Sequence, residues 1–258
     1  MHTIEQYKDE YQRLFDTCII KEPKYPEIDS YINKIVANRS TYESVSQKVN
    51  VPWYFIAIIH NMECSLNFKR HLHNGDPLTA KTVHVSAGRP INGNPPFTWE
   101  ASAIDALTLE GFTAWKDWSV PGMLYSFEKY NGFGYRNKGI NSPYLWSMSN
   151  QYTKGKYTSD GHFDYDAISN QCGAAVLLRR MAEKQIAVVG ETDVISQIKQ
   201  LGQQVKYDPK NYSQSAEQLQ KLLNTVGRHL RVDGFAGRNT SDGYFSISGK
   251  YLTGDKGK

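Results

Sequence analysis

Residues 50–63 read Asn50-Val51-Pro52-Trp53-Tyr54-Phe55-Ile56-Ala57-Ile58-Ile59-His60-Asn61-Met62-Glu63. Asn50 and Pro52 are typical of a helix start, the first as a capping residue and the second because its fixed φ suits the first turn. The stretch from Trp53 to Met62 is apolar almost all round, and a helix of that kind is buried on most of its faces. We therefore predict a buried helix over 53–62 with Glu63 at its end.

Apolar residues recur at helical spacing on both sides of this stretch. They predict that the first 50 residues are helical, with a second helical stretch over 27–48. They also predict helices over 99–119, 121–130, 167–183 and 216–226. Glycines and prolines punctuate residues 70–98, where we expect a small β-hairpin or loop region, and a Gly- and Tyr-rich loop spans 131–165. The small residues Gly173, Ala174 and Ala175 predict close packing against a neighbouring segment.

The helical periodicity weakens towards the C-terminus and divides the chain. We expect a first domain over 1–190, a linker over 191–213 and a small helical domain over 214–258. The predicted fold class is mainly α: an α+β first domain with a small β-hairpin region, followed by a helical C-terminal domain.

The composition and net charge limit the classes of binding partner that we expect. The formal net charge of +4 and the pI of about 8.7 suit an anionic polymer but do not by themselves indicate nucleic acid. The first residues lack the apolar core of a secretory signal, and no run of about 18 apolar residues predicts a membrane span. Cys18, Cys64 and Cys172 fit neither a disulfide framework nor a zinc pattern. We expect a monomer made in the cytoplasm without a signal peptide.

Glu63 is the main candidate for chemistry. Burial disfavours the charged form of a carboxyl, so a carboxylic acid at the end of an apolar helix should have a raised pKa. An acid that is still protonated near neutral pH can donate its proton to a glycosidic oxygen. A glutamate that simply faces solvent at a helix end is the alternative interpretation.

Two motifs resemble those of the goose-type lysozyme and soluble lytic transglycosylase superfamily, over about residues 50–180. Glu63-Cys64-Ser65-Leu66-Asn67-Phe68 resembles its Glu-Ser motif, in which the glutamate ends a buried helix and is the catalytic acid. Lys129-Tyr130-Asn131-Gly132-Phe133-Gly134-Tyr135 resembles its Ala-Tyr-Asn-Ala-Gly motif, which lies beside that acid. The resemblance implies a lysozyme-like catalytic domain of a divergent branch.

A second carboxylate would complete a hydrolase site, whereas a lytic transglycosylase needs none. Asp76, Glu100 and Asp105 are candidates, and we favour Asp76 and Glu100 because both lie in or beside the region rich in glycine and proline; a carboxylate that serves a turn or caps a helix is the alternative for each. Aromatic rings stack on the apolar faces of sugars, so we expect tyrosines and tryptophans to line a glycan groove, although core packing also explains many of them. The predicted substrate-binding residues are His73, Tyr130, Asn131, Tyr135, Tyr144 and Trp146.

Histidines near these motifs raise the alternative of a metal site. His60 with Glu63, and His71 and His73 with Asp76, have the chemistry of metal ligands. The two-histidine helix motif of zinc proteases is absent, however. We therefore expect no metal and no cofactor, with His71 and His73 hydrogen-bonded in the wall of the cleft.

The last 45 residues resemble a small helical peptidoglycan-binding domain. The resemblance rests on Leu219-Gln220-Lys221-Leu222-Leu223-Asn224 and on Val232-Asp233-Gly234-Phe235-Ala236-Gly237-Arg238-Asn239-Thr240. Asp233-Gly234 predicts a tight turn, Gly237 a backbone conformation that favours glycine, and Thr240 the cap of a following helix. We expect that final helix to be short and the tail over 249–258 to be loose.

Both resemblances imply the same polymer. They predict a muramidase or lytic transglycosylase that cleaves peptidoglycan, with Glu63 as general acid, and that reaches the bacterial wall after release or export, as an endolysin or exported enzyme does. Two alternatives stay open: a wall-binding or virion structural protein without catalytic activity, and a chitin or chitosan hydrolase.

Overall fold

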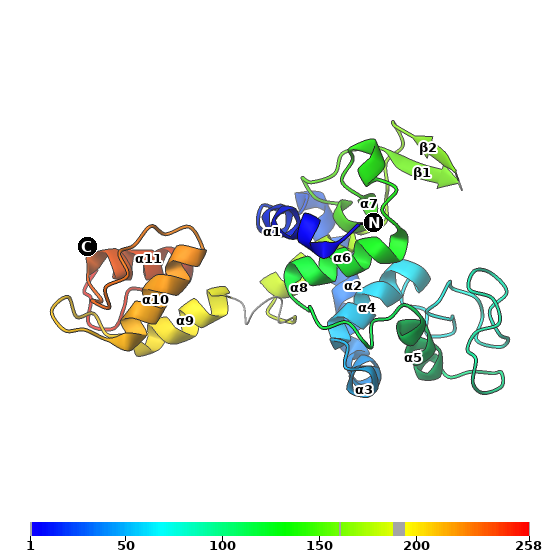
Figure 1. Ribbon diagram of the computed structural model, residues 1–258, viewed down its shortest axis with the longest axis horizontal. Helices are drawn as coiled ribbons and strands as arrows, with labels where there is room; N and C mark the ends of the chain where they lie inside the picture. The colour runs from blue at the N-terminus through cyan, green and yellow to red at the C-terminus, as the bar shows by residue number, and fades with distance from the viewer. Residues whose placement is uncertain (1, 160, 188–193, 258) are drawn as a thin grey trace. The chain divides into compact units, whose positions relative to one another are not determined.

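The computed structural model describes residues 2–159, 161–187 and 194–257, in two compact units, Met1–Ala187 and Val188–Lys258 (Figure 1). The first unit contains the helices α1 (Lys8–Asp16), α2 (Tyr25–Ala37), α3 (Arg39–Val49), α4 (Trp53–Cys64), α5 (Trp99–Leu109), α6 (Val120–Asn131), α7 (Pro143–Trp146) and α8 (Ala174–Glu183), the short 3₁₀ helices Ile4–Gln6, Glu22–Lys24 and Arg136–Lys138, and the strands β1 (Lys156–Ser159) and β2 (His162–Asp164). The second unit contains α9 (Val194–Gln204), α10 (Gln214–Thr225) and α11 (Arg238–Ser248). The predicted mainly α class is confirmed.

Helix α4 forms the centre of the first unit, as its sequence predicts. Ten of its twelve residues are buried, and the two others are Trp53 and Glu63. Phe55 of α4 stacks on Phe127 of α6 with ring centroids 4.5 Å apart, and His60 lies 4.7 Å from the ring of Trp99 at the start of α5. Because α4 is apolar on every side, neighbouring helices cover it almost completely, and only Trp53 and Glu63 are partly exposed.

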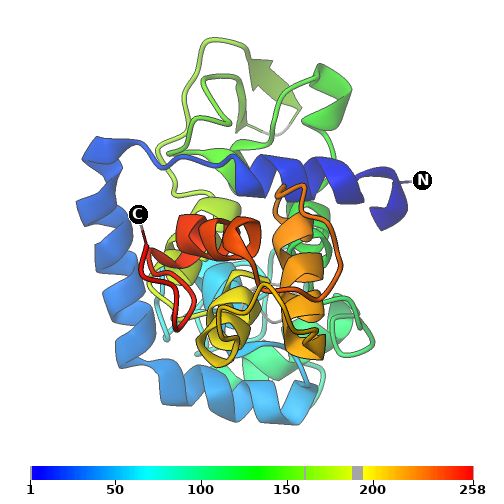
Figure 2. The same ribbon diagram turned by 90° about the vertical axis from the view of Figure 1, so that its left-hand side faces the viewer.

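The first three helices run around the outside of this unit. Figure 2 shows α1, α2 and α3 following one another along its edge, with a corner at Asn38 between α2 and α3. Asn50, predicted to cap α4, instead ends α3 in the left-handed conformation with φ 55°, and Pro52 is the residue that precedes the first turn of α4. Asparagine adopts this conformation more easily than most residues.

Of the two alternatives expected over 70–98, a small β-hairpin or a loop region, the structure forms the loop. Residues 70–98 make turns and one isolated bridge, Arg70 with Pro77, whereas the antiparallel pair β1–β2 lies in the stretch predicted as loop. The carboxylate of Asp76 accepts the backbone N–H groups of Val83 and His84, at 2.8 and 3.1 Å. These amides are satisfied by a side chain, so they are not available to a strand partner.

Helix α8 starts later than predicted, at Ala174 rather than Ala167. Residue 173 accounts for the close packing that its small residues predict, because a Cβ built on Gly173 would lie 2.3 Å from the carbonyl oxygen of Leu145. Helix α5 is also shorter than the predicted 99–119, since it ends at Leu109 and Gly111 follows with φ +78°. A positive φ at this point turns the chain out of the helix.

The second unit has its own core and begins before residue 214. Ile198 of α9 is fully buried against residues of α10 and α11, in a cluster that comprises Ile198, Val205, Ala216, Leu219, Leu223, Ala236, Tyr244 and Leu252. The linker predicted over 191–213 therefore needs correction in its described part, because α9 occupies 194–204 and packs into this core. Residues 191–193 lie outside the described residues.

The end of the chain is more ordered than predicted. Helix α11 spans eleven residues, and Thr240 lies inside it rather than capping it, because Gly237 precedes its first turn. Leu252 in the tail is buried, and the backbone N–H of Tyr207 donates to the carbonyl oxygen of Thr253 at 2.9 Å. The apolar side chain of Leu252 thus anchors a tail that was expected to be loose.

Candidate active site

Glu63 occupies the last turn of α4, where the chain turns sharply. Ser65 and Leu66 both adopt left-handed backbone conformations, with φ of 50° and 60°. The N–H of Ser65 donates to the carbonyl oxygen of Asn61, and that of Leu66 donates to the carbonyl oxygen of His60. This C-cap ends the helix immediately after the carboxylate and holds Glu63 in a partly buried position.

The environment of Glu63 makes it a weaker acid than an ordinary glutamate. Burial raises its pKa to about 7, a hydrogen bond from Tyr144 acts in the opposite direction, and the negative charge of Glu110 raises the pKa further. Among the described residues, no Lys, Arg or His forms an ion pair with Glu63. A carboxyl in this setting is substantially protonated near neutral pH, because no neighbouring cation stabilises its charged form.

Two tyrosines surround this carboxyl. The hydroxyl of Tyr144, on α7, donates to Glu63 Oε1 at 2.9 Å. The hydroxyl of Tyr130, on α6, donates to the carbonyl oxygen of Leu72 at 3.0 Å, and burial together with the charge of Glu63 raises the pKa of Tyr130 well above its ordinary value. The tyrosine of the second motif therefore lies close to the acid, although its hydroxyl is bonded to the backbone rather than to Glu63.

A pocket of about 380 Å³ lies against this group. Its lining residues come from the end of α6, the following loop, α7, β1 and the segment before α8; they are Asn131, Gly132, Gly134, Tyr135, Pro143, Tyr144, Lys156, Tyr157, Ser169 and Gln171. Glu63 is not in this lining. Two of the lining residues nevertheless contact this part of α4. Tyr144 donates a hydrogen bond to Glu63, and Gln171 Nε2 donates to the carbonyl oxygen of Met62 at 2.8 Å.

The structure brings three of the predicted substrate-binding residues together in this pocket: Asn131, Tyr135 and Tyr144. Lys156, Ser169 and Gln171 also line it and are missed by the sequence analysis. They lie 93 or more residues after Glu63 in the sequence, and no motif marks them. These residues line the pocket because β1 and the segment before α8 pack next to α6 and α7, an arrangement that no local sequence pattern encodes.

Trp146 does not belong to this set. Its side chain is 1% exposed and lies among the fully buried residues of the core. A ring with no accessible face cannot stack on a sugar, so the prediction for Trp146 is corrected to a packing role.

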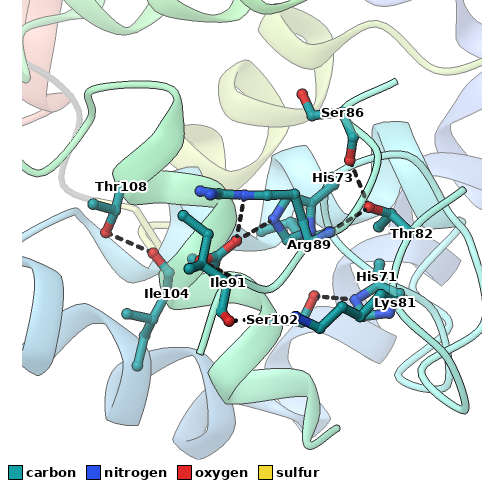
Figure 3. Close-up of polar contacts among 12 residues, drawn as sticks. His71, His73, Lys81, Thr82, Ser86, Arg89, Ile91, Ser102, Ile104 and Thr108 are labelled. Carbon is teal, nitrogen blue, oxygen red and sulfur yellow. Dashed lines mark hydrogen bonds and ion pairs between the residues drawn. The ribbon is translucent and has the colours of Figure 1, made fainter. Parts of the chain in front are cut away.

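His73 is likewise a structural residue (Figure 3). Its side chain is 2% exposed, and its Nε2 lies 2.8 Å from Oδ2 of Asp105 on α5. Arg89 Nε lies 2.9 Å from the same oxygen, and the N–H of Ile91 donates to the other carboxylate oxygen. These contacts fasten the loop over residues 80–94 to α5, and they leave His73 no accessible surface for a substrate.

His71 and His60 are also held by the protein itself. The ring of His71 is hydrogen-bonded at 2.8 Å to Ser102 Oγ and, through its other nitrogen, at 2.8 Å to the carbonyl oxygen of Ala80 (Figure 3). His60 is buried, with Nδ1 3.0 Å from the hydroxyl of Tyr42, and burial lowers its pKa to about 4. Over residues 2–159, 161–187 and 194–257, no three His, Cys, Asp or Glu side chains are grouped to hold a metal ion.

The two predicted carboxylates have different positions. Asp76 faces its own loop: besides two backbone amides it binds the ring of His84 at 2.6 Å, and although burial opposes ionisation, these hydrogen bonds lower its pKa to about 2. Glu100 lies in the first turn of α5, where the helix dipole favours a negative charge. The carboxylate that acts on Glu63 through its charge is Glu110, at the other end of α5, which the sequence analysis does not select.

In the second unit, one buried side chain holds the motif loop together. Gln220 Nε2 donates to Asp233 Oδ1, to the carbonyl oxygen of Phe235 and to Thr240 Oγ1, all within 3.1 Å. Its Oε1 accepts the backbone N–H groups of Asp233 and Gly234. The predicted turn is present, since Gly234 has φ +74°, whereas Gly237 has an ordinary φ of −84°.

Asn224 extends the same arrangement one turn further along α10. Its Nδ2 donates to the carbonyl oxygen of Leu230, and its Oδ1 accepts the N–H of the same residue at 2.7 Å. The polar residues of the Leu-Gln-x-x-Leu-Asn pattern are therefore structural, because they replace the backbone hydrogen bonds that an irregular loop lacks.

Comparison with models of protein families, with curated proteins and with solved structures gives no match for this chain. No helix in the described ranges combines the length and the apolar character needed to cross a membrane.

Proposed function

We propose that this chain cleaves the glycan strands of peptidoglycan, with Glu63 as the general acid. The observation that carries the proposal is a carboxyl whose pKa burial raises to about 7, bonded to a tyrosine that lines a pocket of about 380 Å³. General acids act best when their pKa lies near the working pH, because they are then both protonated and able to release the proton.

The hydrogen bond from Tyr144 gives the acid its orientation. Tyr144 donates to Oε1 of Glu63, so the proton of the neutral carboxyl resides on Oε2. Protonation of a glycosidic oxygen lets the bond to the anomeric carbon break with the sugar hydroxyl as leaving group. A new bond to the anomeric carbon then forms from the oxygen of water in a muramidase, or from a hydroxyl of the substrate itself in a lytic transglycosylase, and the proton lost by the attacking oxygen returns to the carboxylate of Glu63.

A hydrolase needs a second carboxylate to guide the water or to stabilise the cationic sugar. Glu110 is the best candidate for this role, because its charge acts on both Glu63 and Tyr130. Asp76 is less suitable, since its oxygens already accept hydrogen bonds from Val83 and His84.

The resemblance of both motif regions to peptidoglycan-degrading proteins supports the choice of polymer. In this proposal the second unit binds the wall, and it concentrates the enzyme on an insoluble substrate. A pI of about 8.7 favours association with an anionic wall.

The test is the loss of turbidity of purified bacterial walls with the wild type and the Glu63→Gln variant. We expect the substitution to slow cleavage about a hundredfold or more, because glutamine retains the shape and the contact with Tyr144 but has no acidic proton. Glu22→Gln, an exposed glutamate at the surface, is the matched control and should retain full activity. Wall cleavage by Glu63→Gln at the wild-type rate would refute the proposal.

Mass spectrometry of the released fragments then separates the two reaction types. Reducing ends indicate a muramidase, and anhydro-sugars indicate a lytic transglycosylase.

A further inference from the structure

The pocket beside Glu63 contains a single cation. Of the described residues that line it, Lys156 alone carries a formal charge; the others are glycines, a proline, and neutral polar or aromatic side chains. Lys156 is the first residue of β1 and is partly buried. Lys156 therefore supplies the one formal charge among the described residues that line this pocket.

This ammonium has no partner in the described part of the chain, where it forms neither an ion pair within 4.0 Å nor a side-chain hydrogen bond. The nearest acid in the strand register is Asp164, directly across from Lys156 on β2. Asp164 Oδ1 instead accepts the backbone N–H groups of Asp166 and Ala167, at 2.8 and 3.2 Å. Asp164 thus closes its own turn through this oxygen and forms no ion pair with Lys156 within 4.0 Å.

A neighbouring lysine shows the contrast. Lys154, two residues earlier and exposed, pairs with Asp166 at 2.5 Å and does not line the pocket. Among the described residues, this region therefore carries one lysine that is paired at the surface, Lys154, and one that lines the pocket and forms no ion pair, Lys156.

The other walls also leave a hydrogen-bond donor for a ligand. The hydroxyl oxygen of Tyr135 accepts the backbone N–H of Tyr157 at 3.2 Å, so its own proton remains available for donation. Tyr144 cannot act in this way, because its proton is already donated to Glu63. A cation beside a hydroxyl donor matches a carboxylate, which accepts at both of its oxygens.

We propose that Lys156 binds a carboxylate carried by a sugar of the glycan substrate, so that the pocket selects acid-bearing strands over neutral ones. This inference rests on the proposed function and names the substrate class of that site. Muramic acid in peptidoglycan carries such a group on its lactyl side chain wherever no stem peptide is attached, because an attached peptide converts the carboxyl to an amide, whereas chitin carries none. A charge-assisted hydrogen bond of this kind favours the acid-bearing glycan about tenfold or more.

The experiment compares kcat/KM on soluble, peptide-free peptidoglycan glycan strands, whose lactyl carboxyl groups are free, with kcat/KM on the same strands after these groups are reduced to alcohols. The full chain is used, with the variants Lys156→Met, Lys156→Arg and, as the matched control on the same hairpin, Lys154→Met. We expect the wild type to prefer the acid-bearing strands, Lys156→Met to lower this ratio about tenfold, and Lys156→Arg and Lys154→Met to keep it. The loss should fall mainly on KM, since a binding contact remote from the broken bond acts on the ground state and the transition state alike.

Two outcomes overturn different statements. If the ratio of kcat/KM on the acid-bearing strands to kcat/KM on the reduced strands is the same for the wild type and Lys156→Met, Lys156 does not bind the carboxylate. The assignment of Glu63 is unaffected by that result. If the wild type cleaves neither form of the strands, the proposed function itself fails, and the selectivity inferred here fails with it.

Discussion

The hydroxyl of Tyr144 donates a hydrogen bond to Glu63 Oε1 across 2.9 Å, which joins positions 81 residues apart in the sequence. It ties the short helix α7 to the end of the central helix α4, and it connects the candidate acid to a wall of the pocket. The contact also affects the pKa of Glu63, because burial favours the neutral carboxyl whereas this hydrogen bond favours the charged one.

Replacing Tyr144 with phenylalanine should raise the pKa of Glu63 above about 7. The substitution removes a hydrogen bond that stabilises the carboxylate, and Glu63 acts as an acid only when protonated. The alkaline limb of the kcat/KM profile should therefore move to higher pH by about one unit. Tyr152→Phe, whose hydroxyl donates to the carbonyl oxygen of Gly155, is the control and should leave the limb in place. A limb that moves to lower pH in Tyr144→Phe would contradict the assignment.

Removing the charge of Glu110 should have the opposite effect. Its negative charge raises the pKa of Glu63, so Glu110→Gln should shift the alkaline limb to lower pH by about half a unit, and in a hydrolase it should also lower kcat, because the candidate second carboxylate is removed. Glu100→Gln, at the other end of α5, is the matched control. An equal shift in both variants would indicate a general effect of net charge rather than the local repulsion inferred here.

The pKa of Glu63 also predicts a pH dependence of the free energy of unfolding. Between about pH 4.5 and pH 7 the folded state binds more protons at this position than the unfolded state, so stability falls as the pH rises through this interval. Glu63→Gln removes this loss and should raise the free energy of unfolding by up to about 3 kcal/mol at pH 8, with little change at pH 4. Urea denaturation at the two pH values, followed by the signal of the first unit, measures the difference. Equal effects of the substitution at both pH values would mean that Glu63 has an ordinary pKa.

Gln220→Leu should destabilise the second unit by about 3 kcal/mol. Leucine fits the space approximately, but it leaves the amides of Asp233 and Gly234 and the oxygens around them without partners in a buried loop. Hydrogen exchange should show faster opening of α10 and unchanged protection of α4. Gln218→Leu, on the exposed side of the same helix, provides the comparison and should leave the exchange of both helices as in the wild type. Protection of α10 that survives Gln220→Leu would show that the apolar core alone holds the loop.

Much of the helical framework follows from local pattern. The all-round apolar run from Trp53 to Met62 predicts a buried helix, because no face of it is stable in water, and α4 is buried as predicted. The same reasoning places a carboxyl at the end of that helix and predicts its raised pKa. Both predictions depend on residues close to one another in the chain.

The errors arise where a side chain from elsewhere in the chain changes the outcome. Asp76 binds the amides of Val83 and His84, which a β-hairpin would otherwise pair. Ile198 enters the core of the second unit from a stretch whose weak periodicity indicates a linker. In each case the decisive partner lies outside the window over which periodicity is measured.

The sequence by itself determined the central helix, the acid at its end and the two motif regions, because these depend on periodicity and spacing within a few turns of chain. The tertiary structure alone decided which groups act on that carboxyl and which line the pocket next to it: Tyr144, Glu110 and the pocket residue Lys156 come from separate segments. The physical reason is that pKa values and binding depend on distance and burial in space, and both are fixed only when α5, α7 and the β1–β2 hairpin have packed around α4.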